Sequence, residues 1–204
     1  MISDNDRRFY VGASDSKWVI APNHNTKTWQ EKWLVKLGVA EQEDNGNVYT
    51  QAGTRWEHPI LEKYAQEIGI EINKDKQIIL EDKMLRVNYD GDDGVNIYEV
   101  KTHKASNTFE ISPYIDAQCQ TQMYVWQEAQ EDFGKLYVLS YALEDRGYSN
   151  MNPTADDVDF NRIKVHKVKY SKRKAKHFLE CLEPLLPQLK EAKEKADAKR
   201  KEVV

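Results

Sequence analysis

Apolar side chains recur at every third or fourth position in three segments, and this spacing predicts helices. The first helix is expected over 26–37, with Gly38 as its C-terminal stop. The second begins near Thr54 and ends at Gly69, and the third covers 113–130. The stripes of the first two helices are Trp29, Trp33 and Leu37, then Trp56, Ile60, Tyr64 and Ile68.

Between and after these helices the pattern changes to short runs typical of β-strands. The expected strands cover 77–80, 84–89, 96–102, 135–143 and 163–170, and alternating lysines mark the last as an edge strand. The turn-rich residues 90–94 join the second and third strands into a hairpin. The sequence therefore predicts an α/β or α+β fold, with a central mixed sheet flanked by helices.

A long helix closes the chain, with Pro184 and Pro187 expected to break or kink it. Its apolar stripe consists of Phe178, Leu182, Leu185, Leu189, Ala192 and Ala196. The 204 residues fit one domain, and no internal repeat or proline-rich linker divides them. We therefore expect a single domain, 1–204, whose acidic core is followed by a basic strand and helix.

Charge is distributed unevenly along the chain. Residues 1–160 carry 16 basic and 28 acidic side chains, whereas residues 161–204 carry 14 basic and 6 acidic ones. An acidic centre with a basic flank suits a metal-dependent enzyme that acts on a polyanion, although a solvated lysine-rich helix would give the same charge. The mean hydropathy of −0.80, the polar start and the two cysteines predict a cytoplasmic protein without membrane span or disulfide framework.

The most informative stretch is 85–101, where a hairpin would bring Asp90 beside Glu99 and Lys101. Glu99 and Lys101 share one face because side chains alternate along a strand. Two carboxylates and an ammonium group beside a turn form a site for a hard cation such as Mg²⁺. Such an ion activates water and neutralises charge on a phosphodiester, while the lysine can hold the attacking water.

These residues resemble the motifs of the PD-(D/E)XK nuclease superfamily, and within it the lambda-exonuclease or YqaJ-type viral recombination exonucleases. Asp90 and Gly91 match the Asp-Gly motif, and 99–101 match E-x-K, with Tyr89 in place of the usual proline. Asp93 and Gly94 form a competing Asp-Gly pair. The resemblance implies a restriction-endonuclease-like core.

Three further segments resemble the same family in the same order. Residues 10–15 resemble its G-x-(T/S)-A-S-(D/E) element, 53–57 its G-x-x-x-E helix, and 118–123 its Q-x-Q-x-x-M helix. Each segment has a structural alternative. Thr54 and Glu57 would also form a capping box, Ser14 could cap a short helix, and the glutamines could be a solvated helix face.

The resemblance implies a role for each matching residue. The Val100 carbonyl would join Asp90 and Glu99 as a metal ligand, Lys101 would orient the water, and Glu57 would support the metal-water network. One or two Mg²⁺ ions are expected, with Mn²⁺ as a substitute. The remaining assignments are Asp82 for a second metal, Ser14 with Arg7 or Arg8 for a 5′-phosphate, and Gln118 and Gln120 for DNA phosphate.

The sequence thus predicts an exonuclease that degrades duplex DNA from 5′ ends to mononucleotides and leaves a 3′ single strand. By resemblance, a ring-shaped trimer and a single-strand annealing partner are expected. Two rival hypotheses are a structure- or site-specific endonuclease and a non-catalytic DNA- or partner-binding protein of the same fold. The chain contains no H-E-x-x-H, G-x-S-x-G or Walker motif, which argues against ordinary protease, esterase and NTPase chemistry.

Overall fold

The computed structural model describes residues 8–41, 47–130 and 134–202. Five strands form one mixed sheet in the order β1-β2-β3-β4-β5. The β3–β4 pair is parallel and the other three pairs are antiparallel. The strands are β1 (Asn73–Leu80), β2 (Leu85–Asp92), β3 (Ile97–Lys104), β4 (Leu136–Leu143) and β5 (Ile163–Val168). The predicted central mixed sheet flanked by helices is confirmed.

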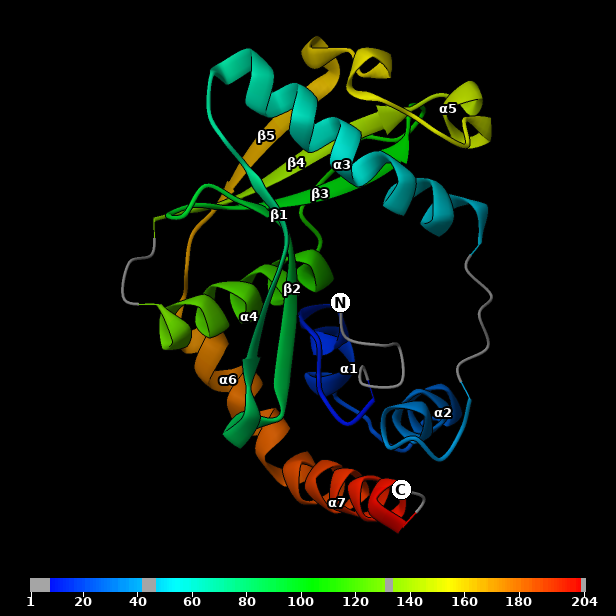
Figure 1. Ribbon diagram of the computed structural model, residues 1–204, viewed down its shortest axis with the longest axis vertical. Coiled ribbons are helices and arrows are strands. Elements are labelled where there is room, and N and C mark those ends of the chain that lie inside the picture. Colours follow the sequence, from blue (N-terminus) through cyan, green and yellow to red (C-terminus); the bar gives the residue numbers. More distant parts are fainter. Residues whose placement is uncertain (1–7, 42–46, 131–133, 203–204) are drawn as a thin grey trace.

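Two long helices pack on opposite faces of the sheet, and each encloses its own apolar cluster (Figure 1). Helix α3 (Val48–Ile68) contributes Trp56 and Ile60 to a cluster with Val100 and Leu139. Helix α4 (Pro113–Ala129) contributes Met123 and Trp126 to the larger cluster on the other face. Residues that alternate along β3 therefore face different cores.

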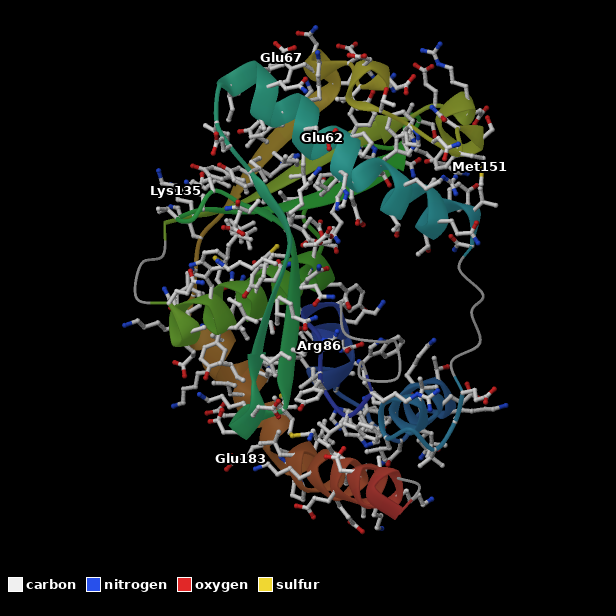
Figure 2. The ribbon with its side chains drawn as sticks, in the orientation of Figure 1. Glu62, Glu67, Arg86, Lys135, Met151 and Glu183 are labelled. Carbon is white, nitrogen blue, oxygen red and sulfur yellow. The ribbon has the colours of Figure 1, made fainter. Side chains whose placement is uncertain are left out.

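The first two strands form a long ribbon that leaves the rest of the sheet and runs toward the C-terminal helices (Figure 1). Arg86 lies on this ribbon, and Figure 2 places it beside the N-terminal helices. These helices are α1 (Ser16–Val19), α2 (Lys27–Lys36) and the 3₁₀ turn η2 (Ala13–Asp15). Val11 pairs with Leu85 in an isolated bridge, so the N-terminal segment docks directly on β2.

The C-terminal part consists of α6 (Lys172–Leu182), the 3₁₀ turn η6 (Glu183–Leu185) and α7 (Leu186–Glu202). The predicted interruption at Pro184 is confirmed, because η6 separates the two α-helices there. Pro187 instead lies in the first turn of α7, where a missing amide hydrogen costs nothing. The indole of Trp33 donates to Gln188 Oε1 at 2.7 Å and joins α2 to α7.

Three further short elements lie between β4 and β5. They are α5 (Asp145–Ser149) and the 3₁₀ turns η4 (Ala155–Asp157) and η5 (Phe160–Arg162). In Figure 2, Lys135 precedes β4 and Met151 follows its far end, so the two residues mark opposite ends of the sheet. Among the described residues, no helix combines the length and apolar character that a membrane span requires.

Two boundaries differ from the predictions in ways that matter for the site. Helix α3 begins six residues early, because the Asn47 side chain accepts from the Thr50 amide and caps the helix. Thr54 and Glu57 therefore lie inside the helix, and the capping-box interpretation is wrong. Strand β2 continues through Asp92 into the predicted turn, so the reversal to β3 occurs over 93–96.

Candidate active site

The Asp90 side chain lies where β2 and β3 separate. The paired positions end at Gly91 opposite Tyr98, and Asp90 Oδ2 accepts from the Val100 amide at 2.8 Å. Backbone groups alternate sides along a strand, and the Ile97 amide faces β4, where it donates to the Lys135 carbonyl. The amide and carbonyl of Val100 therefore both face β2, and the Asp90 carboxylate takes the place of a backbone partner.

The residue after Asp90 is Gly91, and the packing around it leaves no room for a side chain. A Cβ at this position would lie 2.6 Å from Ile72 Cγ2 and 3.2 Å from Leu61 Cδ2. Both neighbours belong to the apolar cluster under α3. A larger residue would push α3 away from the sheet, so glycine permits the close packing that positions Asp90.

Glu99 is the most tightly held carboxylate of the site. Its side chain is 2% exposed, and Oε1 accepts from Gln118 at 2.7 Å, while Oε2 accepts from Gln122 at 2.5 Å. Lys101, two residues along the same face of β3, donates to Glu99 Oε1. Three donors, two of them from α4, therefore fix the orientation of this carboxylate.

Lys101 remains a cation in this environment. Burial alone would lower the pKa of its amine, but the charges of Glu99 and Asp90 raise it well above its usual value. Its side chain is 28% exposed. A permanently charged donor with access to solvent therefore lies beside the two carboxylates.

Glu57 reaches the same site from α3. An added Cβ on Gly53 would lie 3.4 Å from Thr102 Oγ1, so α3 approaches β3 closely one turn before Glu57. Burial and the charge of Glu99 raise the pKa of Glu57 to about 7, although Lys101 lowers it. Burial, Glu99 and Glu57 also raise the pKa of Asp90 well above its usual value. The structure thus brings Asp90, Glu99, Lys101 and Glu57 together.

This donor set fits a hard divalent cation, although the described residues contain no ready cluster of three His, Cys, Asp or Glu ligands. Mg²⁺ commonly uses one or two carboxylates and keeps several waters. Asp90, Glu99 and the Val100 carbonyl could supply the protein oxygens. Gln122 Oε1 is also buried without a hydrogen-bond partner next to Glu99, as expected where a water network is needed.

The competing Asp-Gly pair has a different task. Asp93 Oδ1 accepts from the amides of Val95 and Asn96 at 3.0 and 2.7 Å, and Oδ2 accepts from the Tyr98 hydroxyl at 2.7 Å. Although burial raises the pKa of Asp93, these hydrogen bonds outweigh it and lower the pKa. Asp93 therefore stabilises the β2–β3 turn, and Asp90 is the aspartate that meets Glu99 and Lys101.

The predicted metal role of Asp82 is wrong for an ion shared with Asp90. Asp82 lies in the turn η3 (Glu81–Lys83) before β2, and its side chain is 76% exposed. A strand rises about 3.3 Å per residue, so the five steps from Leu85 to Asp90 span roughly 17 Å. Asp82 and Asp90 therefore lie at opposite ends of one strand.

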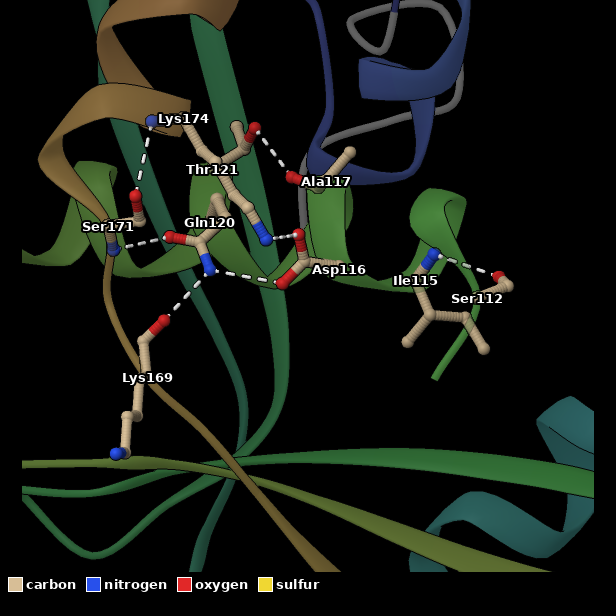
Figure 3. A network of polar contacts seen from close by, with 9 residues as sticks. All are labelled: Ser112, Ile115, Asp116, Ala117, Gln120, Thr121, Lys169, Ser171 and Lys174. Carbon is tan, nitrogen blue, oxygen red and sulfur yellow. Dashed lines mark hydrogen bonds and ion pairs between the residues drawn. The ribbon is translucent and has the colours of Figure 1, made fainter. Parts of the chain in front are cut away.

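The predicted phosphate contact of Gln120 is also contradicted by the geometry. This side chain is 2% exposed, and both ends of its amide have protein partners (Figure 3). Nε2 donates to Asp116 at 3.2 Å and to the Lys169 carbonyl at 2.9 Å, and Oε1 accepts from the Ser171 amide at 2.8 Å. Gln120 therefore holds the joint between β5 and α6 against α4.

The predicted 5′-phosphate residues are only partly described. Arg7 lies outside the described residues. Ser14 is exposed in η2, two residues before Ser16, whose hydroxyl lies 2.8 Å from Thr121 Oγ1 of α4. Arg8 lines a groove with Gly38 and Lys195 near α7. Within the described part of the chain, no contact joins Arg8 to Ser14, so their shared pocket stays a prediction.

Gln122 is a site residue that the sequence did not single out. It lies one helical turn after Gln118 and binds the other oxygen of Glu99. Their i, i+4 spacing places both amides on one face of α4, whereas Gln120 points away. Helical periodicity within the Q-x-Q-x-x-M segment was therefore the signal that separates the two roles.

A sheet fork that carries an aspartate, an E-x-K strand and a supporting glutamate defines the PD-(D/E)XK class of nuclease folds. The sequence model of the YqaJ-like viral recombinase domain matches residues 4–130, and the chain belongs to this family. Among curated protein sequences, no match to the chain is found.

Solved structures give the same fold. An alkaline exonuclease from Laribacter hongkongensis, LHK-Exo, is 17% identical, with a TM-score of 0.65 over 98% of this chain and 97% of that one. Its complex with dAMP is 18% identical, with a TM-score of 0.66 over the same shares. A phage-related exonuclease from Haemophilus somnus 129PT is 16% identical, with a TM-score of 0.61 over 91% and 96%.

Proposed function

We propose that the protein is a Mg²⁺-dependent exonuclease that degrades linear duplex DNA from 5′ ends and leaves a 3′ single strand for recombination. The observation that carries the proposal is the convergence of Asp90, Glu99 and Lys101 at one fork of the sheet. Membership of the YqaJ-like viral recombinase family and the fold shared with exonucleases support it.

Three protein groups would define the reaction geometry. Lys101 presents a charged donor that can hold the attacking water and the phosphate oxygens in line. Gln118 and Gln122 keep Glu99 in a single orientation, which limits the reorganisation needed during the reaction. Glu57, with a pKa of about 7, can accept a proton from the water network near neutral pH.

A divalent cation held by Asp90, Glu99 and the Val100 carbonyl would supply charge neutralisation at the phosphodiester and a more acidic bound water. Without such an ion, the site holds three carboxylates against one ammonium group, and the raised pKa values of Asp90 and Glu57 reflect this imbalance. Added positive charge is therefore what the site lacks for full ionisation.

The proposed products are mononucleotides. The structural neighbour LHK-Exo has been solved in complex with dAMP, a mononucleotide, which supports this assignment. We further propose that the chain acts as a ring-shaped trimer and works with a single-strand annealing protein, both on the basis of the family resemblance. Light scattering of the purified protein tests the trimer independently of catalysis.

The test uses three DNA substrates of equal length, each incubated with and without Mg²⁺. They are a linear duplex with 5′-phosphates, the same duplex with 5′-hydroxyls, and a covalently closed circle. We expect Mg²⁺-dependent release of mononucleotides from the linear substrates, faster from the phosphorylated one, and an intact circle. Strand-specific end labels report the direction of digestion.

Each contrary result has a distinct meaning. Cleavage of the closed circle would indicate an endonuclease of the same fold. Degradation of both linear substrates from 3′ ends would refute the polarity. DNA binding without any Mg²⁺-dependent product would favour a non-catalytic binding protein and reject the proposal.

A further inference from the structure

The strongest concentration of positive charge along the chain lies outside the candidate active site. Residues 164–177 contain seven lysines and arginines and no aspartate or glutamate. All seven are exposed, and Lys174 pairs with Asp116. We call the other six the basic surface: Lys164, Lys167, Lys169, Lys172, Arg173 and Lys176.

The basic surface belongs to ordered elements. Strand β5 carries Lys164 and Lys167 on opposite faces of the sheet edge, Lys169 follows the strand, and α6 carries the other three cations. On α6, the cations lie opposite the buried Ala175, Phe178 and Leu182, so packing directs them outward. Gln120 bonds to the backbone on both sides of Tyr170 and fixes the joint to α4 (Figure 3).

Most of this charge has no partner within the protein. Lys174, the remaining cation of the segment, pairs with Asp116 at 2.6 Å, and Lys176 lies 3.7 Å from Glu180. Across the described residues, no carboxylate lies within ion-pair distance of Lys167, Lys169, Lys172 or Arg173. A rigid array of uncompensated cations is the arrangement that attracts a polyanion.

We propose that the basic surface binds the sugar–phosphate backbone of the DNA duplex, a short distance from the end being cut. The inference rests on the proposed nuclease function. Gln118 and Gln122 of α4 contact Glu99, and Gln120 on the other side of α4 contacts the β5–α6 joint. A helix with its side chains is about 10–12 Å across, so roughly this distance separates the joint from Glu99. A duplex with its end at the active site can therefore lie against both.

The surface fits duplex better than single-stranded DNA. Proteins that hold single strands combine cations with aromatic rings on which bases stack. Within 164–177, all of which the structure describes, Val165 is the large hydrophobic side chain that is exposed, and Tyr170 is partly covered. Lysines with no exposed Phe, Tyr or Trp ring among them suit contacts to phosphates along an intact helix.

An alternative explanation is that the lysines only protect an exposed sheet edge from pairing with another strand. Charge reversal separates the two roles, because glutamate protects an edge as lysine does but repels phosphate. The test variant is Lys167→Glu/Lys169→Glu/Lys172→Glu. The matched control is Lys27→Glu/Lys32→Glu/Lys190→Glu, three exposed lysines outside the surface with the same change in net charge.

Binding is measured in full-length protein that also carries Lys101→Ala, so that the DNA stays intact. The probes are a 40-base-pair duplex and a 40-nucleotide single strand, each titrated over a range of KCl concentrations. Each lost phosphate contact removes about 0.9 from the slope of log affinity against log salt. We expect the test variant to lose roughly 2–3 from the duplex slope and the control to lose less than 1.

Three outcomes would overturn the proposal. Equal losses in both variants would mean that only net charge matters, and unchanged slopes would mean that the surface does not bind DNA. A loss confined to the single strand would assign the surface to the product strand. Mg²⁺-dependent cleavage by the otherwise unaltered protein is measured separately, so failure of the proposed activity is distinguishable from failure of this inference.

Discussion

The two faces of helix α4 carry chemically similar glutamines that serve different purposes. On one face, Gln118 and Gln122 donate to Glu99, a catalytic candidate. On the other, Gln120 bonds to the backbone around Tyr170 and to Asp116. Glutamines of one motif therefore have different roles, because the partner on each side of the helix determines what each side chain does.

The two faces also differ in what their partners need. Glu99 is a buried carboxylate of the candidate metal site, so the donors that orient it affect reactivity. The backbone groups near Tyr170 are neutral and are fully paired by Gln120, so that face affects stability. Substitutions on each side should therefore separate activity from folding.

Removing the charge of Lys101, which lies beside Glu99, should give the largest effect. Lys101→Ala is expected to lower Mg²⁺-dependent cleavage by about 10²–10⁴-fold, the usual contribution of a positioned proton-transfer or charge-stabilising group. The fold and DNA affinity should change little, because the side chain is not part of the core. Lys104→Ala, three residues along the same strand and exposed, is the control. Undiminished cleavage by Lys101→Ala would refute the assigned role.

The next largest effect is expected from the hydrogen bond between Gln122 and Glu99. Gln122→Leu removes the donor to Glu99 Oε2, and we expect cleavage to fall about 10- to 100-fold, equivalent to roughly 1.4–2.7 kcal/mol. The loss should reside mainly in kcat, because substrate contacts are unchanged. Steady-state kinetics on an end-labelled duplex measures it. A variant with normal kcat and only reduced stability would mean that the two faces of α4 do not differ.

On the other face of α4, a substitution of Gln120 should lower stability and leave activity nearly unchanged. Gln120→Leu leaves the Ser171 amide and the Lys169 carbonyl without their partner, and such losses cost about 1–3 kcal/mol each. We expect urea unfolding to report this destabilisation, while cleavage per folded molecule stays within threefold of the original. A specific loss of phosphate binding by a stably folded variant would restore the original prediction for Gln120.

The smallest effect concerns pH. The pKa of Glu57 is raised to about 7 in the folded protein, so between about pH 4.5 and 7 the native state binds more protons than the unfolded state. Metal-free stability should therefore fall as pH rises through this range. Glu57→Gln should flatten this dependence and raise the melting temperature at pH 8 by a few degrees, as measured by calorimetry. Identical pH profiles would contradict the cause given for the shift.

Sequence reasoning predicted the parts of this molecule that depend on local patterns. The strand that carries Glu99 and Lys101 followed from alternation. The stop at Gly69 followed from the tolerance of glycine for the left-handed conformation, which it adopts here with φ 70°. The approach of Asp90 to Glu99 was predicted, because an antiparallel hairpin puts residues 90 and 99 opposite each other, whereas the separation of the two strands at Asp90 was not. The family motifs added Glu57, which no local pattern would connect to the hairpin.

The errors arose where distant contacts decide the outcome. Asp82 is near Asp90 in sequence, but an intervening strand separates them in space. Gln120 is two residues from Gln118, but the β5–α6 joint that occupies its amide is about fifty residues away along the chain. The early start of α3 depended on the Asn47 side chain, which the apolar pattern beginning at Trp56 does not reveal.

The contact between Trp33 and Gln188 has a consequence for the order in which the chain can fold during synthesis. Trp29 and Trp33 share their apolar cluster with Leu185 and Leu189, which leave the ribosome about 150 residues later. The nascent N-terminal helices therefore wait for this packing partner until about 150 further residues have been made. Chaperone protection should matter most in that interval, and truncation before Leu185 should leave two tryptophans exposed to water.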